Sequence, residues 1–262
     1  MNESNFNIKL DASYLKLDSR LYSKIRPDSV RNPQVILFNH VLATELGVNL
    51  YDEKSIANIF SGNEVIHDTT PFSQSYSGHQ FGYFTKLGDG RAIVLGELVK
   101  NDKLYDIQLK GSGRTPYSRN GDGKATLYSM LREYLISEAM YYLGISTTRS
   151  LAVIANDEKV IREEIHRGAI LTRIAESHIR IGTFEHVAAL NNKRLLQEFT
   201  DYAIKRHYPD LMGKEDQYIW FFKRVCDRQI ELIIHWLRVG FIHGVMNTDN
   251  VSIPGETIDY GP

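Results

Sequence analysis

Glycine is concentrated in one part of this sequence. Nine of the 19 glycines lie between positions 78 and 123. Because glycine loses more backbone entropy on folding than any other residue, such a cluster is typical of tight turns or of a backbone that approaches a ligand closely. A hairpin turn explains any one of these glycines. We interpret the cluster as a whole as a ligand-binding region.

Charge and cysteine content exclude several classes of protein. Lys and Arg total 31 and Asp and Glu total 32, so the formal net charge is −1. This balance argues against a dedicated nucleic-acid or anionic-membrane surface, although it allows a local basic pocket. The single cysteine, Cys226, rules out an internal disulfide and a cysteine-based metal cluster.

Targeting segments are not evident. Residues 1–20 lack the apolar core of a signal peptide, and no apolar run approaches the ~18 residues that a membrane span needs. We therefore expect a cytoplasmic protein without a membrane or nucleic-acid partner, built as one large domain or two small ones.

Residues 32–110 contain a predicted helix and a predicted hairpin. Asn32 is a plausible N-cap followed by Pro33, which predicts a helix over 32–46 that ends at Gly47. Residues 91–99 and 105–110 read as two strands joined by a short polar connection, which predicts a hairpin.

Two longer helices are predicted, and strands are expected at 150–155 and 169–174 around the charged segment 156–167. The helix over 126–142 is predicted from an apolar stripe made of Leu127, Leu131, Tyr134, Leu135 and Tyr142. The second helix is closed by Gly240, and its stripe is Ile219, Phe222, Cys226, Ile230, Ile233 and Leu237. On that stripe Cys226 is expected to be a buried small apolar residue.

The polar motifs follow the order of a protein-kinase-like nucleotide site. These motifs are a glycine turn at 88–91, a strand lysine at Lys110, a helix glutamate at Glu133, an Asn/Asp loop at 243–250 and an Asp-x-Gly at 259–261. Glycines let backbone N–H groups approach phosphate oxygens. A strand lysine held by a carboxylate neutralises phosphates, and Asn and Asp supply the oxygen ligands that Mg²⁺ or Mn²⁺ prefers. Arg173 and Arg180 could clamp a phosphate.

Each motif also has a purely structural explanation. Gly-Asp-Gly is a common turn, Lys110 could end an edge strand, and Glu133 lies off the apolar stripe, as on a solvated helix face. The two arginines could form surface ion pairs, and Asp259 could cap a turn. Asp122 and Gly123 form either one more turn or a loop that closes over the nucleotide. The joint order of the motifs favours a nucleotide site.

The loop at 243–250 departs from kinases at one position. If His243-Gly244 aligns with a His-Gly-Asp start, Val245 takes the place of the catalytic aspartate, and valine cannot accept a proton. Asn250 stands where a metal-binding asparagine is expected. Asp249 is the only carboxylate in the loop that could replace the base. The chain is therefore either an inactive pseudokinase or an enzyme whose chemistry is rearranged around Asp249.

Four long segments closely resemble the selenoprotein O family, called SelO or YdiU in bacteria. They are PFSQSYSGHQFGYFTKLGDGRA (71–92), DIQLKGSGRTPYSRNGDGKATLYSMLREYLISEAM (106–140), LTRIAESHIRIGTFEH (171–186) and HGVMNTDNVSIPGETIDYGP (243–262). The resemblance runs from about residue 10 to the last residue. It implies a pseudokinase fold that transfers AMP from ATP to protein hydroxyls, with a nucleotide flipped relative to that in kinases. UMP transfer from UTP with Mn²⁺ is also attributed to bacterial members.

The resemblance also implies roles for particular residues. Asp249 is the implied base, and Asn250 and Asp259 are the implied ligands of Mg²⁺ or Mn²⁺. Glu133 is the implied partner of Lys110. The implied nucleotide-binding residues are Gly88, Gly90, Arg91, Lys110, Asp122, Gly123, Arg173, Arg180 and Asp259.

We therefore expect an α+β, kinase-like fold. The expected divisions are an N-terminal extension at 1–75, an N-lobe with an antiparallel sheet and a helix at 76–178, and a partial helical C-lobe at 179–262. Family members are nearly twice as long, so we expect a fragment whose C-lobe is cut off after Asp-Tyr-Gly. Two alternatives remain: ordinary phosphoryl transfer, and a nucleotide-binding scaffold without turnover.

Overall fold

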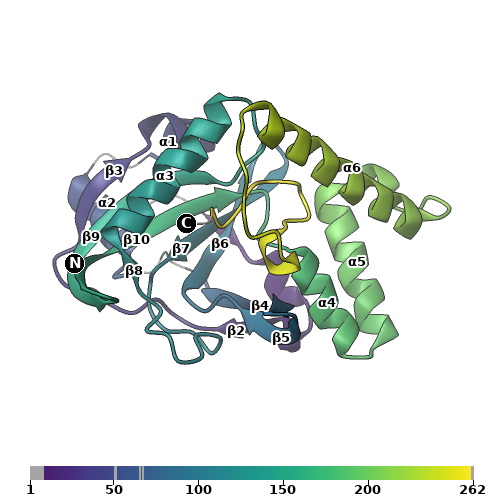
Figure 1. The fold of residues 1–262 in the computed structure, drawn as a ribbon, viewed down its shortest axis with the longest axis horizontal. Helices are drawn as coiled ribbons and strands as arrows, with labels where there is room; N and C mark the ends of the chain where they lie inside the picture. The colour runs from purple at the N-terminus through teal and green to yellow at the C-terminus, as the bar shows by residue number, and fades with distance from the viewer. Residues whose placement is uncertain (1–8, 50–51, 65, 67, 261–262) are drawn as a thin grey trace.

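The computed structural model describes residues 9–49, 52–64, 66 and 68–260 (Figure 1). The fold is α+β, as expected: the described residues contain one ten-stranded antiparallel sheet and six α-helices. The strand order along the sheet is β2-β4-β6-β7-β10-β9-β3, and off this path β1 pairs with β6, β5 with β4 and β8 with β10. Helices α4, α5 and α6 gather beyond the end of the sheet that carries β4 and β5, whereas α3 lies across β9 and β10.

A hairpin forms the centre of the sheet. Strands β6 (Ala92–Lys100) and β7 (Lys103–Lys110) pair as predicted. The Asn101-Asp102 turn has φ values of 50° and 59°, the left-handed conformation that matches the twist of a two-residue hairpin. Because β7 pairs with β6 on one side and β10 on the other, it is an interior strand, and Lys110 does not end an edge strand.

The charged segment 156–167 is not a separate connection, as the sequence suggested, but the outer part of a second hairpin. Strand β9 spans Arg149–Ile161 and β10 spans Ile165–Ala175. Their inner halves are buried, and their outer halves are largely exposed, which accommodates charge on both strands. The other strands are β1 (Leu10–Asp11), β2 (Tyr22–Lys24), β3 (Gln34–Phe38), β4 (Phe72–Gln80), β5 (Tyr83–Gly88) and β8 (Ala125–Thr126).

The helix predicted over 32–46 is wrong in its first half. Residues Gln34–Phe38 form β3, which pairs with β9, and only His40–Leu46 is helical (α1). The Asn39 side chain accepts a hydrogen bond from the N–H of Leu42 and so caps α1 in place of Asn32. The predicted end at Gly47 is confirmed, because Gly47 has a φ of 75°. Helix α2 follows at Glu53–Ser61.

Helix α3 (Leu127–Tyr142) begins after the cap Thr126, close to the predicted start, but its buried face coincides only in part with the predicted stripe. Its buried residues are Met130, Glu133, Ser137, Glu138 and Met140. Leu135 and Tyr142 from the predicted stripe are 67% and 68% exposed. Leu127, Leu131 and Tyr134 of the stripe are partly buried against the core, so the prediction is wrong only for Leu135 and Tyr142. It missed Glu133 and Glu138 because they pair with charges on the sheet, and an apolar pattern does not reveal such residues.

The remaining helices are α4 (Ile181–Ala189), α5 (Lys193–His207) and α6 (Gln217–Arg238). Helix α6 exists as predicted, but Phe221, Val225, Leu232 and Trp236 form its buried side. The predicted stripe is mostly exposed, and Cys226 is only partly buried. Apolar residues occupy both faces of this helix, so periodicity alone did not identify the packed one.

No helix in the described part of the chain is long and apolar enough to cross a membrane. Short 3₁₀ turns lie at Ser13–Lys16, Ser19–Leu21, Pro209–Leu211 and Thr248–Asn250.

A buried ion-pair network attaches α5 to the sheet. Arg206 donates hydrogen bonds to Glu97 Oε1 and Asp106 Oδ1, each at 2.6 Å. The other oxygen of Asp106 accepts hydrogen bonds from the backbone N–H of His178 at 2.8 Å and lies 3.1 Å from its ring Nδ1. Because all these groups are nearly inaccessible to solvent, the charges must be paired, and the network fixes α5 against β6 and β7.

This attachment predicts a pH-dependent stability. Burial and the neighbouring Arg206 charge lower the pKa of His207 to about 3. Arg228 lowers this pKa further, whereas Asp106 raises it. Below pH 6.5 the unfolded chain therefore binds a proton at His207 that the folded chain does not. The free energy of unfolding should then fall as the pH falls from 6.5 toward 3, by up to about 1.4 kcal/mol per pH unit from this residue.

Urea unfolding at several pH values tests this prediction by comparing the wild type with His207→Gln. The comparison is needed because burial raises the pKa of Asp89 and of Glu256, which act in the opposite direction at acidic pH. The variant should lose stability less steeply between pH 6.5 and 4.5. Parallel pH profiles would contradict the assignment of a neutral, buried His207.

Candidate functional site

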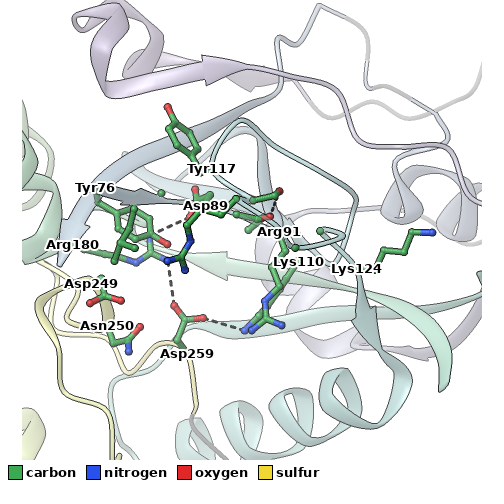
Figure 2. Close-up of a pocket in the computed structure, with 18 of the residues that line it drawn as sticks. Tyr76, Asp89, Arg91, Lys110, Tyr117, Lys124, Arg180, Asp249, Asn250 and Asp259 are labelled. Carbon is green, nitrogen blue, oxygen red and sulfur yellow. Dashed lines mark hydrogen bonds and ion pairs between the residues drawn. The ribbon is translucent and has the colours of Figure 1, made fainter. Parts of the chain in front are cut away.

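A cavity of about 540 Å³ lies where the sheet, α3 and the segment 245–260 meet (Figure 2). Its carboxylates are Asp89, Asp122, Asp249 and Asp259. Its cationic side chains are twice as numerous: Arg91, Lys110, Arg119, Lys124, Arg132, Arg162, Arg173 and Arg180. Such an excess of positive charge in a concave site suits a polyanion such as a triphosphate.

Lys110 and Glu133 form a buried ion pair on one wall of this cavity. Lys110 Nζ donates a hydrogen bond to Glu133 Oε2 at 2.7 Å, and the two residues are 6% and 4% exposed. Glu133 therefore faces the sheet and not solvent. Arg173 Nε donates to the other oxygen, Glu133 Oε1, at 2.5 Å. One helix carboxylate thus holds two cations from adjacent strands, β7 and β10.

Asp259 joins the same cluster from the far end of the sequence. Its Oδ1 accepts hydrogen bonds from Lys110 at 3.1 Å and from Arg173 at 2.5 Å, and its Oδ2 accepts one from Arg180 at 3.3 Å. Burial alone would raise the pKa of Asp259, but the charges of Arg173, Lys110 and Arg180 outweigh it and hold the pKa well below its usual range. Asp259 is therefore an ion-pair partner and not a simple turn cap.

Arg180 lies between two carboxylates. Figure 2 shows its guanidinium between Asp89 and Asp259, and its Nη1 is 3.5 Å from Asp89 Oδ1. The guanidinium also stacks on the Tyr76 ring, 4.4 Å from the ring centroid. Arg173 and Arg180 are each 1% exposed, so both are interior residues and not members of surface ion pairs.

The glycine turn at 88–91 packs closely against the segment 115–118. A Cβ on Gly88 would lie 2.4 Å from the Tyr117 ring, and one on Gly90 would lie 2.9 Å from the Tyr117 carbonyl oxygen. Thr115 Oγ1 donates a hydrogen bond to the carbonyl of Asp89 at 2.7 Å. Both glycines line the cavity, together with Arg91, so the turn is held by its neighbours and faces the candidate site.

Asp122 has a partner that sequence reasoning missed. Arg162, at the turn between β9 and β10, donates hydrogen bonds to Asp122 Oδ2 at 2.8 Å and to Oδ1 at 3.0 Å. These hydrogen bonds lower the pKa of Asp122 to about 2. Gly123 is needed for a close backbone approach, since its Cβ would lie 2.0 Å from the Gly113 carbonyl oxygen. No local pattern in the charged segment 156–167 singled out Arg162.

The loop at 243–250 brings Asp249 and Asn250 to the cavity, and Val245 also lines it. Asn250 donates a hydrogen bond from Nδ2 to the carbonyl of Val245 at 3.1 Å. Asp249 Oδ1 is buried without a hydrogen-bond partner among the described residues. Burial raises the pKa of Asp249.

Asp249, Asn250 and Asp259 lie near one another in Figure 2, with the Asp259 carboxylate directed at its cationic partners. Two carboxylates and an amide are hard ligands of the kind that Mg²⁺ or Mn²⁺ binds together with phosphate and water. Within the described ranges, no three His, Cys, Asp or Glu side chains converge as a complete metal site. The donor types therefore suit a divalent cation, while in this structure both Asp259 oxygens accept hydrogen bonds from Lys110, Arg173 and Arg180. Gly261, the last residue of the Asp-Tyr-Gly motif, lies outside the described residues.

Comparisons with known proteins agree with the resemblance noted from the motifs. Residues 5–262 match the family described as "Protein adenylyltransferase SelO". The chain is 55% identical to a protein nucleotidyltransferase YdiU of Clostridium perfringens (strain SM101), an alignment that covers 100% of this chain and 55% of that protein. It is 51% identical to the protein of the same name from Nitrosococcus oceani, over 100% of this chain and 54% of that protein. The chain thus spans about half the length of these curated relatives.

The buried cluster predicts a large cost for removing its central carboxylate. Glu133→Ala leaves Lys110 and Arg173 with Asp259 as their remaining buried counter-charge. We expect a loss of about 3–5 kcal/mol in the free energy of unfolding, measured in urea. The control is Glu198→Ala on α5, whose carboxylate pairs with Arg194 at the exposed surface and should contribute at most about 1 kcal/mol. Equal costs for the two variants would show that the cluster does not stabilise the fold.

Proposed function

Because the chain belongs to the SelO family of protein adenylyltransferases, we propose that it carries the nucleotide site of a metal-dependent protein nucleotidyltransferase. The proposed reaction transfers AMP from ATP to Ser, Thr or Tyr hydroxyls of target proteins. The observation that carries the proposal is the cavity in which Lys110, Arg173 and Arg180 gather beside Asp249, while Val245 stands at the position of a kinase base.

The proposal includes a kinase-like division of the chain. Residues 76–178 would form the N-lobe, with Lys110 on β7 held by Glu133 on α3, and 179–262 would form a partial helical C-lobe. The segment 1–75 would be an extension that packs on this core. Its support is that β1, β2 and β3 add to the sheet by pairing with β6, β4 and β9.

In the proposed mechanism the target hydroxyl oxygen attacks the α-phosphorus of the nucleotide. Asp249 accepts the hydroxyl proton, the bond from the α-phosphorus to the bridging oxygen breaks, and pyrophosphate leaves with the bonding electrons. Lys110, Arg173 and Arg180 would bind the phosphates and stabilise the negative charge that develops on them. Asn250 and Asp259 would hold Mg²⁺ or Mn²⁺, which neutralises phosphate charge when bound.

The position of the transferred label distinguishes this reaction from its alternatives. The chain, and in parallel a longer chain that contains it, is incubated with Mg²⁺ or Mn²⁺ and either α-³²P-ATP or γ-³²P-ATP, and protein-bound label is counted. We expect label from the α-position only, because Val245 cannot serve as the base for γ-phosphoryl transfer. The same assay with α-³²P-UTP tests UMP transfer.

Two other outcomes would contradict the proposal. Label from the γ-position would identify a kinase-type phosphotransferase. A melting temperature that ATP raises, without transfer of either label, would identify a nucleotide-binding scaffold.

The role of Asp249 predicts a separation of binding from catalysis. Asp249→Asn keeps the size of the side chain but removes the proton acceptor, so we expect transfer to fall by about 10²–10⁴-fold. ATP affinity, measured by calorimetry, should change by less than about threefold, because the phosphate-binding cations are untouched. Asp227→Asn, at an exposed position on α6, is the matched control and should keep full activity. A parallel loss of ATP binding in Asp249→Asn would assign this residue to the nucleotide and not to the proton.

A further inference from the structure

We propose that Gly78 on β4 and Gly182 on α4 are positioning residues that fix the Asp249 carboxylate by leaving room for it. The proposal rests on the proposed function, because it concerns the residue assigned there as the base. Neither glycine was singled out by the motifs of the nucleotide site.

Gly78 contacts the carboxylate directly. A Cβ at this position would lie 2.4 Å from Asp249 Oδ1, 2.9 Å from its Cγ and 3.1 Å from its Cβ. Approaches below 3.0 Å are essentially never seen for real Cβ atoms. Gly78 is not among the residues with positive φ, so its backbone conformation does not require glycine. The space taken by Asp249 requires it.

Gly182 lies against the backbone of the same residue, Asp249. It lies in the first turn of α4, where a Cβ would be 2.1 Å from the Ser77 carbonyl oxygen and 3.2 Å from Asp249 Cα. Strand β4, helix α4 and the turn at Thr248–Asn250 therefore meet at backbone contact distance. An added Cβ at position 182 would meet backbone, whereas at position 78 it would meet the Asp249 side chain and force it to shift.

The loop that carries Asp249 is also held against α4, so it cannot retreat from an added side chain without breaking contacts. The N–H of Ile181 donates a hydrogen bond to the carbonyl of Val251 at 2.8 Å. Thr248 Oγ1 donates one to Glu185 Oε2 at 2.5 Å. These bonds anchor the loop on both sides of Asp249.

Packing takes the place of hydrogen bonds in orienting this carboxylate. Buried polar atoms normally have hydrogen-bond partners, yet Asp249 Oδ1 has none in the part of the chain that the structure describes. Oδ1 is instead enclosed against Gly78, although Asp249 itself lines the cavity. A methyl group at position 78 would move the carboxylate by roughly an ångström, and a displacement of that size at a reacting group costs about 100-fold in rate.

The kinetic test compares two alanine substitutions in the same hairpin. Gly78→Ala should lower kcat for nucleotidyl transfer about 100-fold while the KM and Kd for ATP stay within about twofold. Gly82→Ala, in the turn between β4 and β5, adds a methyl group with nothing within 4 Å but strains a backbone at φ 83°, so an unchanged kcat in this control would show that strain in the hairpin alone does not lower turnover. Wild-type kcat in Gly78→Ala would overturn the proposal, as would equal losses of turnover and ATP binding.

A second test does not depend on activity and so separates this proposal from the proposed function. Gly78→Ala is made in the wild type and in Asp249→Ala, which lacks the Oδ1 and Cγ atoms that the new methyl group would meet. The urea midpoint should fall in the wild-type background and fall clearly less in Asp249→Ala. Equal shifts in the two backgrounds would overturn the proposal, whether or not the protein transfers nucleotide.

Discussion

Two carboxylates, the buried Glu133 and the partly exposed Asp259, share one small volume with three buried cations, and the arrangement of the surrounding elements follows from the need to pair them. Unpaired charge is costly away from water, so each group must lie within reach of an opposite one. Strands β7 and β10 place Lys110 and Arg173 side by side, α3 adds Glu133, and the segment after α6 adds Asp259. These four elements each supply one charge, and Arg180, which also pairs with Asp259, leaves the cluster with one more cation than carboxylate. The ion pairs thereby help to specify a single packing of helix, sheet and C-terminal segment.

Beside this charged cluster, in the same cavity, the Asp249 carboxylate is positioned by shape and not by hydrogen bonds. Asp249 is surrounded by backbone from β4 and α4, and its enclosed oxygen has no partner among the described residues. One cavity therefore combines a cation-rich wall, suited to phosphates, with a carboxylate whose position is set by steric contact. This division matches the two tasks of the proposed reaction, in which charge stabilisation and proton removal occur at different atoms of the substrates.

Sequence reasoning succeeded for features that depend on a residue type with a specific structural role, such as a glycine that ends a helix. The polar connection before Lys103 predicted the central hairpin, and Gly47 predicted the end of α1. The order of Lys110, Glu133 and Asp259 predicted groups that do converge. It failed where hydrophobicity was the guide: the buried face of α3 is partly ionic, and α6 is apolar on both sides. The pairing of Arg162 with Asp122 joins residues 40 positions apart, and the fit of Asp249 against Gly78 depends on three elements meeting. Such contacts have no local signature.

The sequence separations within the charged cluster also set an order of assembly. Glu133 is 23 residues from Lys110 and 40 from Arg173, whereas Asp259 is 149 residues from Lys110 and 86 from Arg173. A ribosome therefore delivers the three cations and Glu133 long before the second carboxylate exists. Closing the longer loops costs more chain entropy, and contacts of high sequence separation form slowly. The sheet and α3 can thus associate first around three cations and one carboxylate, and arrival of the segment 251–260 adds the second carboxylate and reduces the excess positive charge. The charged wall of the cavity is therefore complete only after this late segment has joined the sheet and α3.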